Sequence, residues 1–215
     1  LAIRLGELNT MDFEFSDDQL SLRDAVARWV DKGFAFDRRH ALAKAGGGTR
    51  SVYAELAELG LTGLAIAEAQ GGMSFSAVEA MVVMEELGRG IVLEPFTHTL
   101  IASGVISGYA PSELKSAWLP GIASGEKLVV LAYQERANRY KLDSCAATAQ
   151  NGTAGWTLSG SKSIVAAGDQ ADTAAECRSM HARYRGFRQI GQRAHQFGEL
   201  ERVGVAGHQA RVLEH

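Results

Sequence analysis

The spacing of apolar residues follows a helical period in the first part of the chain. From Phe15 the sequence FSDDQLSLRDAVARWVDKGF places apolar residues three and four positions apart, and Ser16 with Gln19 forms a capping box. These signals predict an amphipathic helix that begins at Ser16. A second helix is predicted between the glycine run at 46–48 and Gly60, which would end it as a C-cap. The apolar stripe of this second helix is Val52, Leu56 and Leu59.

Further helices are predicted after the second glycine-rich connector. Ser76 and Glu79 can cap a helix over Ala77 to Gly88. A small-residue segment, Thr97 to Gly108, predicts a buried helix, and another helix is expected over 112–119 because a proline follows it. In the helix over Ala77 to Gly88, the side chains expected to face inward are Val78, Met81, Val82 and Leu87.

The pattern becomes typical of strands after Lys127. The segment LVVLAYQE at 128–135 is rich in β-branched and aromatic residues, and 144–149 could form another short strand. Gly155 to Gly160, followed by Lys162 to Val165, predicts a strand, a turn and a strand. A helical region is therefore followed by a β-rich region.

These elements predict an α+β protein. Its N-terminal domain would be all-helical over 11–125 and would be followed by a partial β-domain over 126–173. Residues 1–10, which precede Met11, are interpreted as a leader or read-through. From 174 to 215 arginine occurs without lysine, histidine is frequent, and no period of 2 or 3.6 persists. We interpret this tail as aberrant, out of frame or foreign, and disordered; the alternative is a flexible basic extension that binds an acidic partner.

Composition and charge narrow the classes of function. The formal net charge is -3, and acidic and basic residues are interspersed along most of the chain, so neither nucleic acid nor a membrane surface is an expected partner. Cys145 and Cys177 lack the CxxC spacing and clustered histidines of a zinc site, so no metal site is predicted. No apolar run approaches the roughly 20 residues that span a bilayer. We expect a cytoplasmic protein.

Two common kinds of catalytic motif are missing from the sequence. No GxSxG motif places a serine at a strand-to-helix turn. The glycine clusters at 46–48 and 71–72 carry neither the Lys-Ser/Thr ending of a phosphate loop nor the spacing of a dinucleotide site. They are interpreted as turns that separate helices.

Several short segments occur along the chain in a fixed order. In the helical region they are Phe15–Gln19, Glu58–Leu64, Ala69–Gly72, Glu85–Gly88 and Leu119–Glu126. In the β-rich region they are Leu158–Lys162 and Gly168–Asp172. Over about residues 12 to 172 this order resembles the acyl-CoA dehydrogenase family. The resemblance implies a helical domain, a β-domain and a C-terminal helical bundle, and the last of these is expected to be missing here.

The resemblance also implies a cofactor, a substrate and partners. They are FAD, an acyl-CoA thioester, and electron-transfer flavoprotein or a similar acceptor, in a homo- or hetero-oligomer. In the family a carboxylate removes an α-proton while a hydride passes to the flavin. That carboxylate belongs to the C-terminal helical domain, and Glu85, Glu86 and Glu135 match no catalytic position of the family. No catalytic residue is therefore assigned.

The site residues follow from two segments that match the family. Residues 131–140 correspond to the segment that bonds the flavin ring and, further on, holds the CoA arm, whereas 164–166 correspond to a Trp-Ile-Thr segment against the flavin. The cofactor-binding residues that the resemblance implies are Leu131, Tyr133, Gln134, Ile164, Val165 and Ala166. Tyr140 is the implied substrate-binding residue.

The same segments depart from the family pattern. The usual Thr-Glu-Pro has become Gln134-Glu135-Arg136, and Trp-Ile-Thr has become Ile164-Val165-Ala166, so a hydroxyl and an indole contact are lost while backbone donors remain. Such changes resemble the small subunits of two-gene bacterial acyl-CoA dehydrogenases such as pimeloyl-CoA dehydrogenase. Two hypotheses stay open: a truncated flavoenzyme subunit, and a non-catalytic partner of a homologous chain. Ordinary strand packing is the alternative for Tyr133, Gln134 and Ile164, and a solvated loop is the alternative to phosphate contacts for Arg136 and Arg139.

Overall fold

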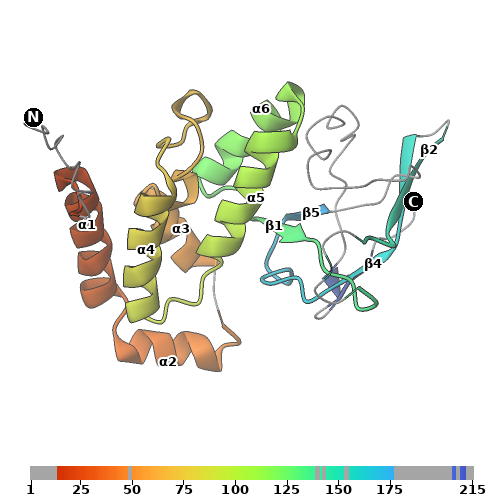
Figure 1. The fold of residues 1–215 in the computed structure, drawn as a ribbon. Helices are drawn as coiled ribbons and strands as arrows, with labels where there is room; N and C mark the ends of the chain where they lie inside the picture. The colour runs from red at the N-terminus through yellow and green to blue at the C-terminus, as the bar shows by residue number, and fades with distance from the viewer. Residues whose placement is uncertain are drawn as a thin grey trace, which may run out of the picture.

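Helices and strands occupy separate parts of the molecule. A computed structural model describes residues 14–47, 50–138, 141, 144–152, 155–176, 205–206 and 209–211. The helices lie between Asp17 and Ala123, and the strands follow from Val129 onward, beside the helical part (Figure 1). This arrangement confirms the predicted α+β fold class. In the part of the chain that is described, no helix is long and apolar enough to cross a membrane.

The helical part consists of α-helices and two short 3-10 turns. The α-helices are α1 (Asp17–Gly33), α2 (Phe36–Lys44), α3 (Arg50–Glu58), α4 (Ala77–Arg89), α5 (Phe96–Tyr109) and α6 (Ser112–Ala123). The 3-10 turns are η1 (Leu61–Gly63) and η2 (Glu68–Gln70).

Both predicted capping boxes are present and contact each other. At the start of α1, Gln19 N donates to Ser16 Oγ at 3.2 Å, and Ser16 N donates to Gln19 Oε1 at 3.0 Å. At the start of α4, Ser76 N donates to Glu79 Oε2 at 2.8 Å. Gln19 Nε2 also donates to Glu79 Oε1 at 2.7 Å, and the bonds from Ser76 and Gln19 lower the pKa of Glu79 to about 2. The caps therefore tie the beginnings of α1 and α4 together.

The sequence pattern did not predict α2. None of its residues is buried, so it has no apolar stripe that a periodicity could indicate. Two arginines hold it in place. Arg38 Nη1 donates to Gly33 O at 2.7 Å and to Glu55 Oε2 at 3.1 Å, and Arg39 Nη1 donates to Gly90 O at 2.7 Å. Polar contacts with α1, α3 and the end of α4 thus take the place of core packing.

Pro120 does not end α6, contrary to the prediction. The helix continues to Ala123, although a proline inside a helix costs about 3 kcal/mol. Leu119 and Ile122, on either side of the proline, are fully buried. Burying an aliphatic side chain contributes about 1.5 to 3 kcal/mol, so these two residues offset the cost.

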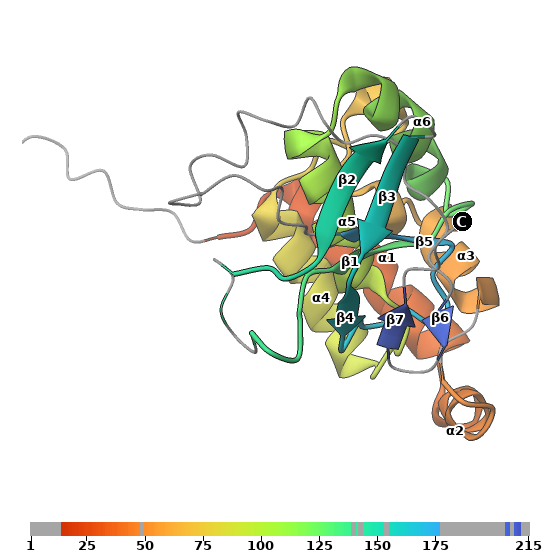
Figure 2. The same ribbon diagram turned by 90° about the vertical axis from the view of Figure 1, so that its right-hand side faces the viewer.

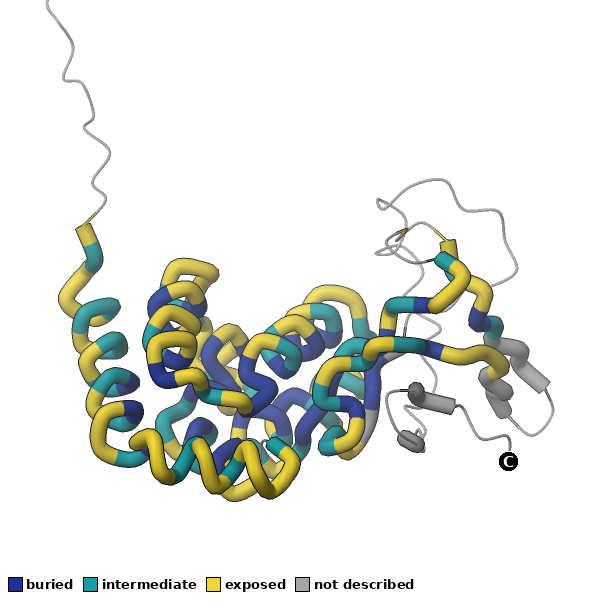
Figure 3. Tube along the Cα trace, turned by 90° about the horizontal axis from the view of Figure 1, so that it is seen from below, coloured by how far each residue is buried: buried dark blue, intermediate teal, exposed yellow. Residues whose placement is uncertain are grey.

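The apolar core runs from the helices into the first strand. Val26 and Leu56 belong to a cluster that joins α1, α3 and α4. A second cluster joins Ile106 of α5 and Leu119 of α6 to Val129 of the first strand. Buried segments accordingly line the inside of the helical part and reach the strand beside it (Figure 3).

A polar contact also connects the two parts. Leu128 N donates to Asp172 Oδ2 at 2.7 Å, and Asp172 N donates to Leu128 O at 2.9 Å. Arg50, at the start of α3, reaches the same carboxylate oxygen at 2.7 Å and the carbonyl of Glu126 at 3.1 Å. The entry to the first strand is therefore fixed by a charged group on α3.

The strands form small separate sheets. Their pairings are β1 (Val129–Ala132) parallel to β5 (Thr173–Glu176), β2 (Thr148–Gly152) antiparallel to β3 (Gly155–Ser159), and β4 (Ser161–Ser163) antiparallel to β7 (Gln209–Arg211), which also pairs with β6 (Val205–Ala206). Figure 2 shows β2 and β3 side by side, with β4 and β7 below them.

The strands of the β-rich region agree with the predictions only in part. The two strands predicted within 155–165 are present as β3 and β4, but they pair with β2 and β7 and not with each other, because only Gly160 separates them and a hairpin needs a turn of at least about two residues. The strand predicted at 144–149 begins instead at Thr148. Residues 174–176, assigned to the tail on composition, lie in β5, where the side chains of Ala174 and Ala175 are buried. Apart from β6 and β7, residues 177–215 lie outside the described residues, as do 1–10.

Candidate functional site

The first predicted cofactor segment lies at the end of β1. Leu131 is half-buried within the strand, and Tyr133, just beyond it, is 46% exposed. Gln134 is half-buried. Tyr140, the implied substrate-binding residue, lies outside the described residues. The side chain of Tyr133 therefore lies partly exposed at the surface.

The second predicted cofactor segment follows β4. Ile164 is 71% exposed and Ala166 is also exposed. Val165 is half-buried and packs against the buried residues Val130 and Ala132 of β1. The three residues therefore alternate, with two at the surface and one against the strand.

One backbone hydrogen bond joins the two segments. Ser163 N donates to Gln134 O at 2.8 Å, so the residues after β1 and those after β4 are neighbours. Tyr133 and Ile164, on either side of this contact, are large apolar side chains at the surface. We give the name apolar wall to the apolar residues on either side of this bond, which are Tyr133, Ile164, Val165 and Ala166.

Ile164 has a strained backbone conformation. Its φ is 54°, in the left-handed region, which a β-branched side chain rarely adopts. The cost is of order 1 to 3 kcal/mol and persists only where the surroundings impose it. A turn begins at the next residue, where Gly168 N donates to Val165 O at 3.1 Å.

A buried ion pair lies next to this junction. Lys162 Nζ is 2.7 Å from Glu135 Oε1, and the two side chains are only 1% and 5% exposed. Glu135 directly follows Gln134, and Lys162 directly precedes Ser163. The pair therefore joins the same two segments that the backbone bond joins.

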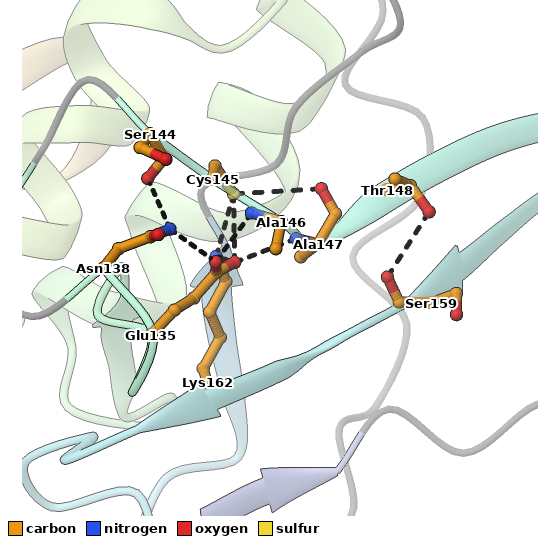
Figure 4. A network of polar contacts seen from close by, with 9 residues as sticks. All are labelled: Glu135, Asn138, Ser144, Cys145, Ala146, Ala147, Thr148, Ser159 and Lys162. Carbon is orange, nitrogen blue, oxygen red and sulfur yellow. Dashed lines mark hydrogen bonds and ion pairs between the residues drawn. The ribbon is translucent and has the colours of Figure 1, made fainter.

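Glu135 accepts several further hydrogen bonds (Figure 4). Ala146 N donates to Oε2 at 2.6 Å and Ala147 N donates to Oε1 at 2.9 Å. Asn138 Nδ2 donates to Oε2 at 2.8 Å and also to the carbonyl of Ser144 at 2.9 Å. The carboxylate thus orders the loop before β2, which explains why the strand starts only at Thr148.

Cys145 completes the cluster. Its Sγ is 3.1 Å from Lys162 Nζ, which donates to it, and 3.2 Å from Glu135 Oε1, to which the thiol donates. The residue is half-buried. We call Glu135, Cys145 and Lys162 the buried triad.

Glu135 and Lys162 of the triad stay charged although their side chains are buried. Burial raises the pKa of Glu135, but the Lys162 ammonium and the amides of Ala146 and Ala147 outweigh it and lower the pKa to about 2. Burial likewise lowers the pKa of Lys162, whereas Glu135 raises it, and the net pKa is raised. Both groups are therefore ionised at neutral pH.

The sequence pattern does not indicate the triad as a unit. Glu135 was considered only as a catalytic candidate, and Lys162 only as part of a family segment. Lys162 stands between two serines in a three-residue strand, so no apolar period marks it as buried. The contact joins Glu135 and Lys162, which are 27 positions apart, and spacing does not reveal it.

A second surface lies on α4 and α5. The prediction that Val78 and Met81 face inward was wrong, since they are 42% and 49% exposed, whereas Val82 and Leu87 are buried as expected. α4 has more apolar residues than one stripe holds, so the helical period alone does not tell which of them pack on α1. We define the helical face as Val78, Met81, Met84, Thr97 and Ile101.

The helical face continues from one helix to the next. Thr97 Oγ1 lies 3.5 Å from Met84 Sδ, which brings the start of α5 against α4. Gly88, Gly104 and Gly108 on the same two helices have nothing within 4 Å of the place of a Cβ atom. An exposed surface of apolar and small residues is typical of a region that another element or chain covers.

Comparison with known proteins identifies the family. The family described as "Acyl-CoA dehydrogenase, N-terminal domain" matches residues 16–126. Acyl-CoA dehydrogenase FadE12 of Mycobacterium tuberculosis is 29% identical over 161 residues, which are 73% of this chain and 40% of that protein. The chain belongs to the acyl-CoA dehydrogenase family.

Solved structures share the fold. The ChsE4-ChsE5 complex from Mycobacterium tuberculosis matches with a TM-score of 0.69 and 22% identity, over 80% of this chain and 46% of that chain. A glutaryl-CoA dehydrogenase from Mycobacterium smegmatis in complex with FADH2 matches with a TM-score of 0.67 and 19% identity, over 78% and 44%. The chain therefore spans less than half the length of these relatives.

The exposed side chains of the apolar wall include an aromatic ring and a branched aliphatic group, which are types that contact planar ring systems. No cluster of histidine, cysteine, aspartate or glutamate that could hold a metal ion occurs among the residues that the structure describes.

Proposed function

We propose that the chain supplies a helical domain (11–125) and a partial β-domain (126–173) to a cytoplasmic acyl-CoA dehydrogenase. The enzyme would catalyse FAD-dependent α,β-dehydrogenation of an acyl-CoA thioester. The observation that carries the proposal is the bond between Ser163 N and Gln134 O, because it unites two segments that match the family's flavin-contacting segments. A thiol at Cys145 that bonds to charged side chains suits a reducing compartment.

The apolar wall would hold the flavin. Tyr133 and Ile164 would lie against the ring, and the backbone of Leu131, Val165 and Ala166 would position it. FAD, when bound, supplies the acceptor for the hydride. Tyr140 would contact the thioester arm, and electron-transfer flavoprotein or a similar protein would reoxidise the enzyme.

Glu135 is unsuited to the role of base. Its pKa of about 2 and its several donors leave little tendency to take a proton from carbon near neutral pH. We infer that the base comes from a residue outside the described part of this chain, or from a second chain.

Flavin binding and turnover test the proposal. We expect the isolated chain to bind FAD weakly and to oxidise no acyl-CoA, because the wall provides only one side of a flavin site. With a larger homologous chain added, Tyr133→Ala should weaken FAD binding by about tenfold, the loss expected for one ring contact, and the flavin absorbance retained after desalting should fall with it. Phe36→Ala, which removes a 66% exposed ring on α2, is the matched control. Flavin retention by Tyr133→Ala at the level of the unmodified chain would contradict the proposed wall.

The helical face favours a second function, that of a partner subunit. A likeness to one chain of the ChsE4-ChsE5 complex supports pairing with a homologous chain. The loss of the family's threonine and tryptophan at Gln134 and Ile164 is compatible with unequal contributions of the two chains to one site. Flavin and activity that appear only with the larger chain would favour this function.

A charge on the helical face should weaken association. Met81 is 49% exposed, so Met81→Glu should change the free energy of unfolding by less than about 0.5 kcal/mol. Burying the new carboxylate in an interface should weaken binding of a homologous chain by at least about tenfold. Sedimentation velocity of mixtures measures the effect, and Phe36→Glu on α2 is the control. Equal binding by both variants would show that the partner uses another surface.

A further inference from the structure

The buried triad contains a reactive combination that flavin chemistry does not use. The Cys145 thiol and the Lys162 amine belong to segments 17 residues apart, yet their Sγ and Nζ atoms are 3.1 Å from each other. Lys162 is 1% exposed, and the Glu135 carboxylate contacts both groups at 2.7 and 3.2 Å. A nucleophilic sulfur, a nitrogen and a carboxylate thus meet at one point.

We propose that the triad is an oxidation-sensitive site, at which a peroxide joins Cys145 to Lys162 through a covalent sulfur–nitrogen bond. Peroxide first transfers an oxygen atom to the sulfur, which gives a sulfenic acid and water. Lys162 loses one proton to water, and its neutral nitrogen then attacks the sulfur. The S–O bond breaks, the S–N bond forms, and the hydroxyl leaves with a second amine proton as water. Sulfur is oxidised and peroxide is reduced.

Three features of the site favour this step. Lys162 Nζ donates to Cys145 Sγ at 3.1 Å, so the two atoms to be joined are already in contact. Half-burial of Cys145 admits a small oxidant, while the burial of Lys162 keeps its nitrogen away from competing reagents. Glu135 Oε1 accepts hydrogen bonds from both Lys162 Nζ and Cys145 Sγ, so it holds the nitrogen beside the sulfur.

The cross-link would remove the cation from the ion pair. Glu135 would then hold a proton or remain as a buried carboxylate with only neutral donors, next to the junction of Gln134 and Ser163. A reducing thiol would cleave the S–N bond and restore the pair. The site would therefore change reversibly with the redox state of its surroundings.

Mass spectrometry of the full chain tests the proposal. Cys177→Ser leaves Cys145 as the sole thiol. After treatment with hydrogen peroxide and chymotryptic digestion, we expect a species joining the peptides of Cys145 and Lys162, lighter than their sum by two hydrogen atoms and separated by dithiothreitol. Its yield should be at least about tenfold higher from folded protein than from protein in urea, because proximity drives the second step.

Lys162→Arg and a sulfenic-acid trap give the decisive controls. With Lys162→Arg, dimedone should label Cys145 and no cross-link should form. In the Lys162 protein, dimedone labelling of Cys145 without any cross-linked species would overturn the proposal, as would equal cross-linking in urea. If Lys162→Arg does not fold, the comparison of folded and urea-treated protein decides by itself.

Discussion

Lys162→Met should lower the free energy of unfolding by about 3 kcal/mol. Methionine fills a similar volume but leaves the Glu135 carboxylate buried without its cation, and breaking a buried pair from one side typically costs about 3 to 5 kcal/mol. The bonds from Ala146, Ala147 and Asn138 remain, so the lower end of that range is expected. Urea unfolding of the full chain, followed by circular dichroism, measures the change.

Two further variants test whether the cost of Lys162→Met arises from the unpaired Glu135 carboxylate or from the loss of any lysine. Lys141→Met removes an exposed lysine from the neighbouring loop and should stay within about 0.5 kcal/mol of the original chain. Glu135→Leu combined with Lys162→Met should cost less than Lys162→Met alone, because no unpaired charge remains. If the double variant is less stable than Lys162→Met, the unpaired Glu135 carboxylate does not explain the cost of the single substitution.

Lowering the pH should remove the contribution of the Glu135–Lys162 pair to the free energy of unfolding. The pKa of Glu135 is lowered from an ordinary 4.5 to about 2, so its contribution is complete above the unfolded pKa of 4.5 and is lost as the pH falls towards 2. A shift of this size corresponds to about 3 kcal/mol. Unfolding measured at pH 6 and pH 3 should therefore show a smaller difference between Lys162→Met and the original chain at the lower pH. An unchanged difference would indicate that Glu135 is not the titrating group.

Gly72→Ala should also destabilise the chain by about 3 kcal/mol. A Cβ atom at this position would lie 2.1 Å from the carbonyl oxygen of Ile66, and both atoms belong to the backbone or are fixed to it. Ile66 is fully buried, and Ser74 N donates to the same carbonyl oxygen at 2.9 Å, so the backbone can give way only by breaking this contact. The shift in the midpoint of urea unfolding measures the cost.

The adjacent glycine provides the control. A Cβ atom at Gly71 would meet only Ala123 Cβ, at 3.9 Å, and the cost arises from its φ of +83° alone. Gly71→Ala should therefore cost about 1 to 2 kcal/mol. Equal losses for the two variants would show that backbone conformation, and not the close approach to Ile66, explains the Gly71-Gly72 pair.

The helices could be predicted where local signals are strong. Ser16 and Ser76 begin α1 and α4 because a capping box involves residues only three positions apart. α2 and the end of α6 were missed because distant contacts decide them. Arg38 and Arg39 reach other helices, and Leu119 and Ile122 bury themselves in a core that local sequence does not display.

The sequence predicts the two segments of the candidate site but not the contact between them. The resemblance to a family selected 131–134 and 164–166, and the structure brings them together at Gln134 and Ser163. The buried triad joins residues 10 to 27 positions apart and includes a lysine in a polar strand, so neither composition nor period indicated it. Contacts between residues far apart in sequence carry no local pattern.

The shared core of α5, α6 and β1 has a consequence for dividing this chain into autonomous pieces. Ile106, Leu119 and Val129 belong to one buried cluster. The carboxylate of Asp172 accepts hydrogen bonds from Leu128 N, just before β1, and from Arg50 of α3. A cut after residue 125 would expose the apolar side chains of α5 and α6 to water. The change from helix to strand marks a boundary in the sequence, whereas the unit that folds cooperatively extends across it.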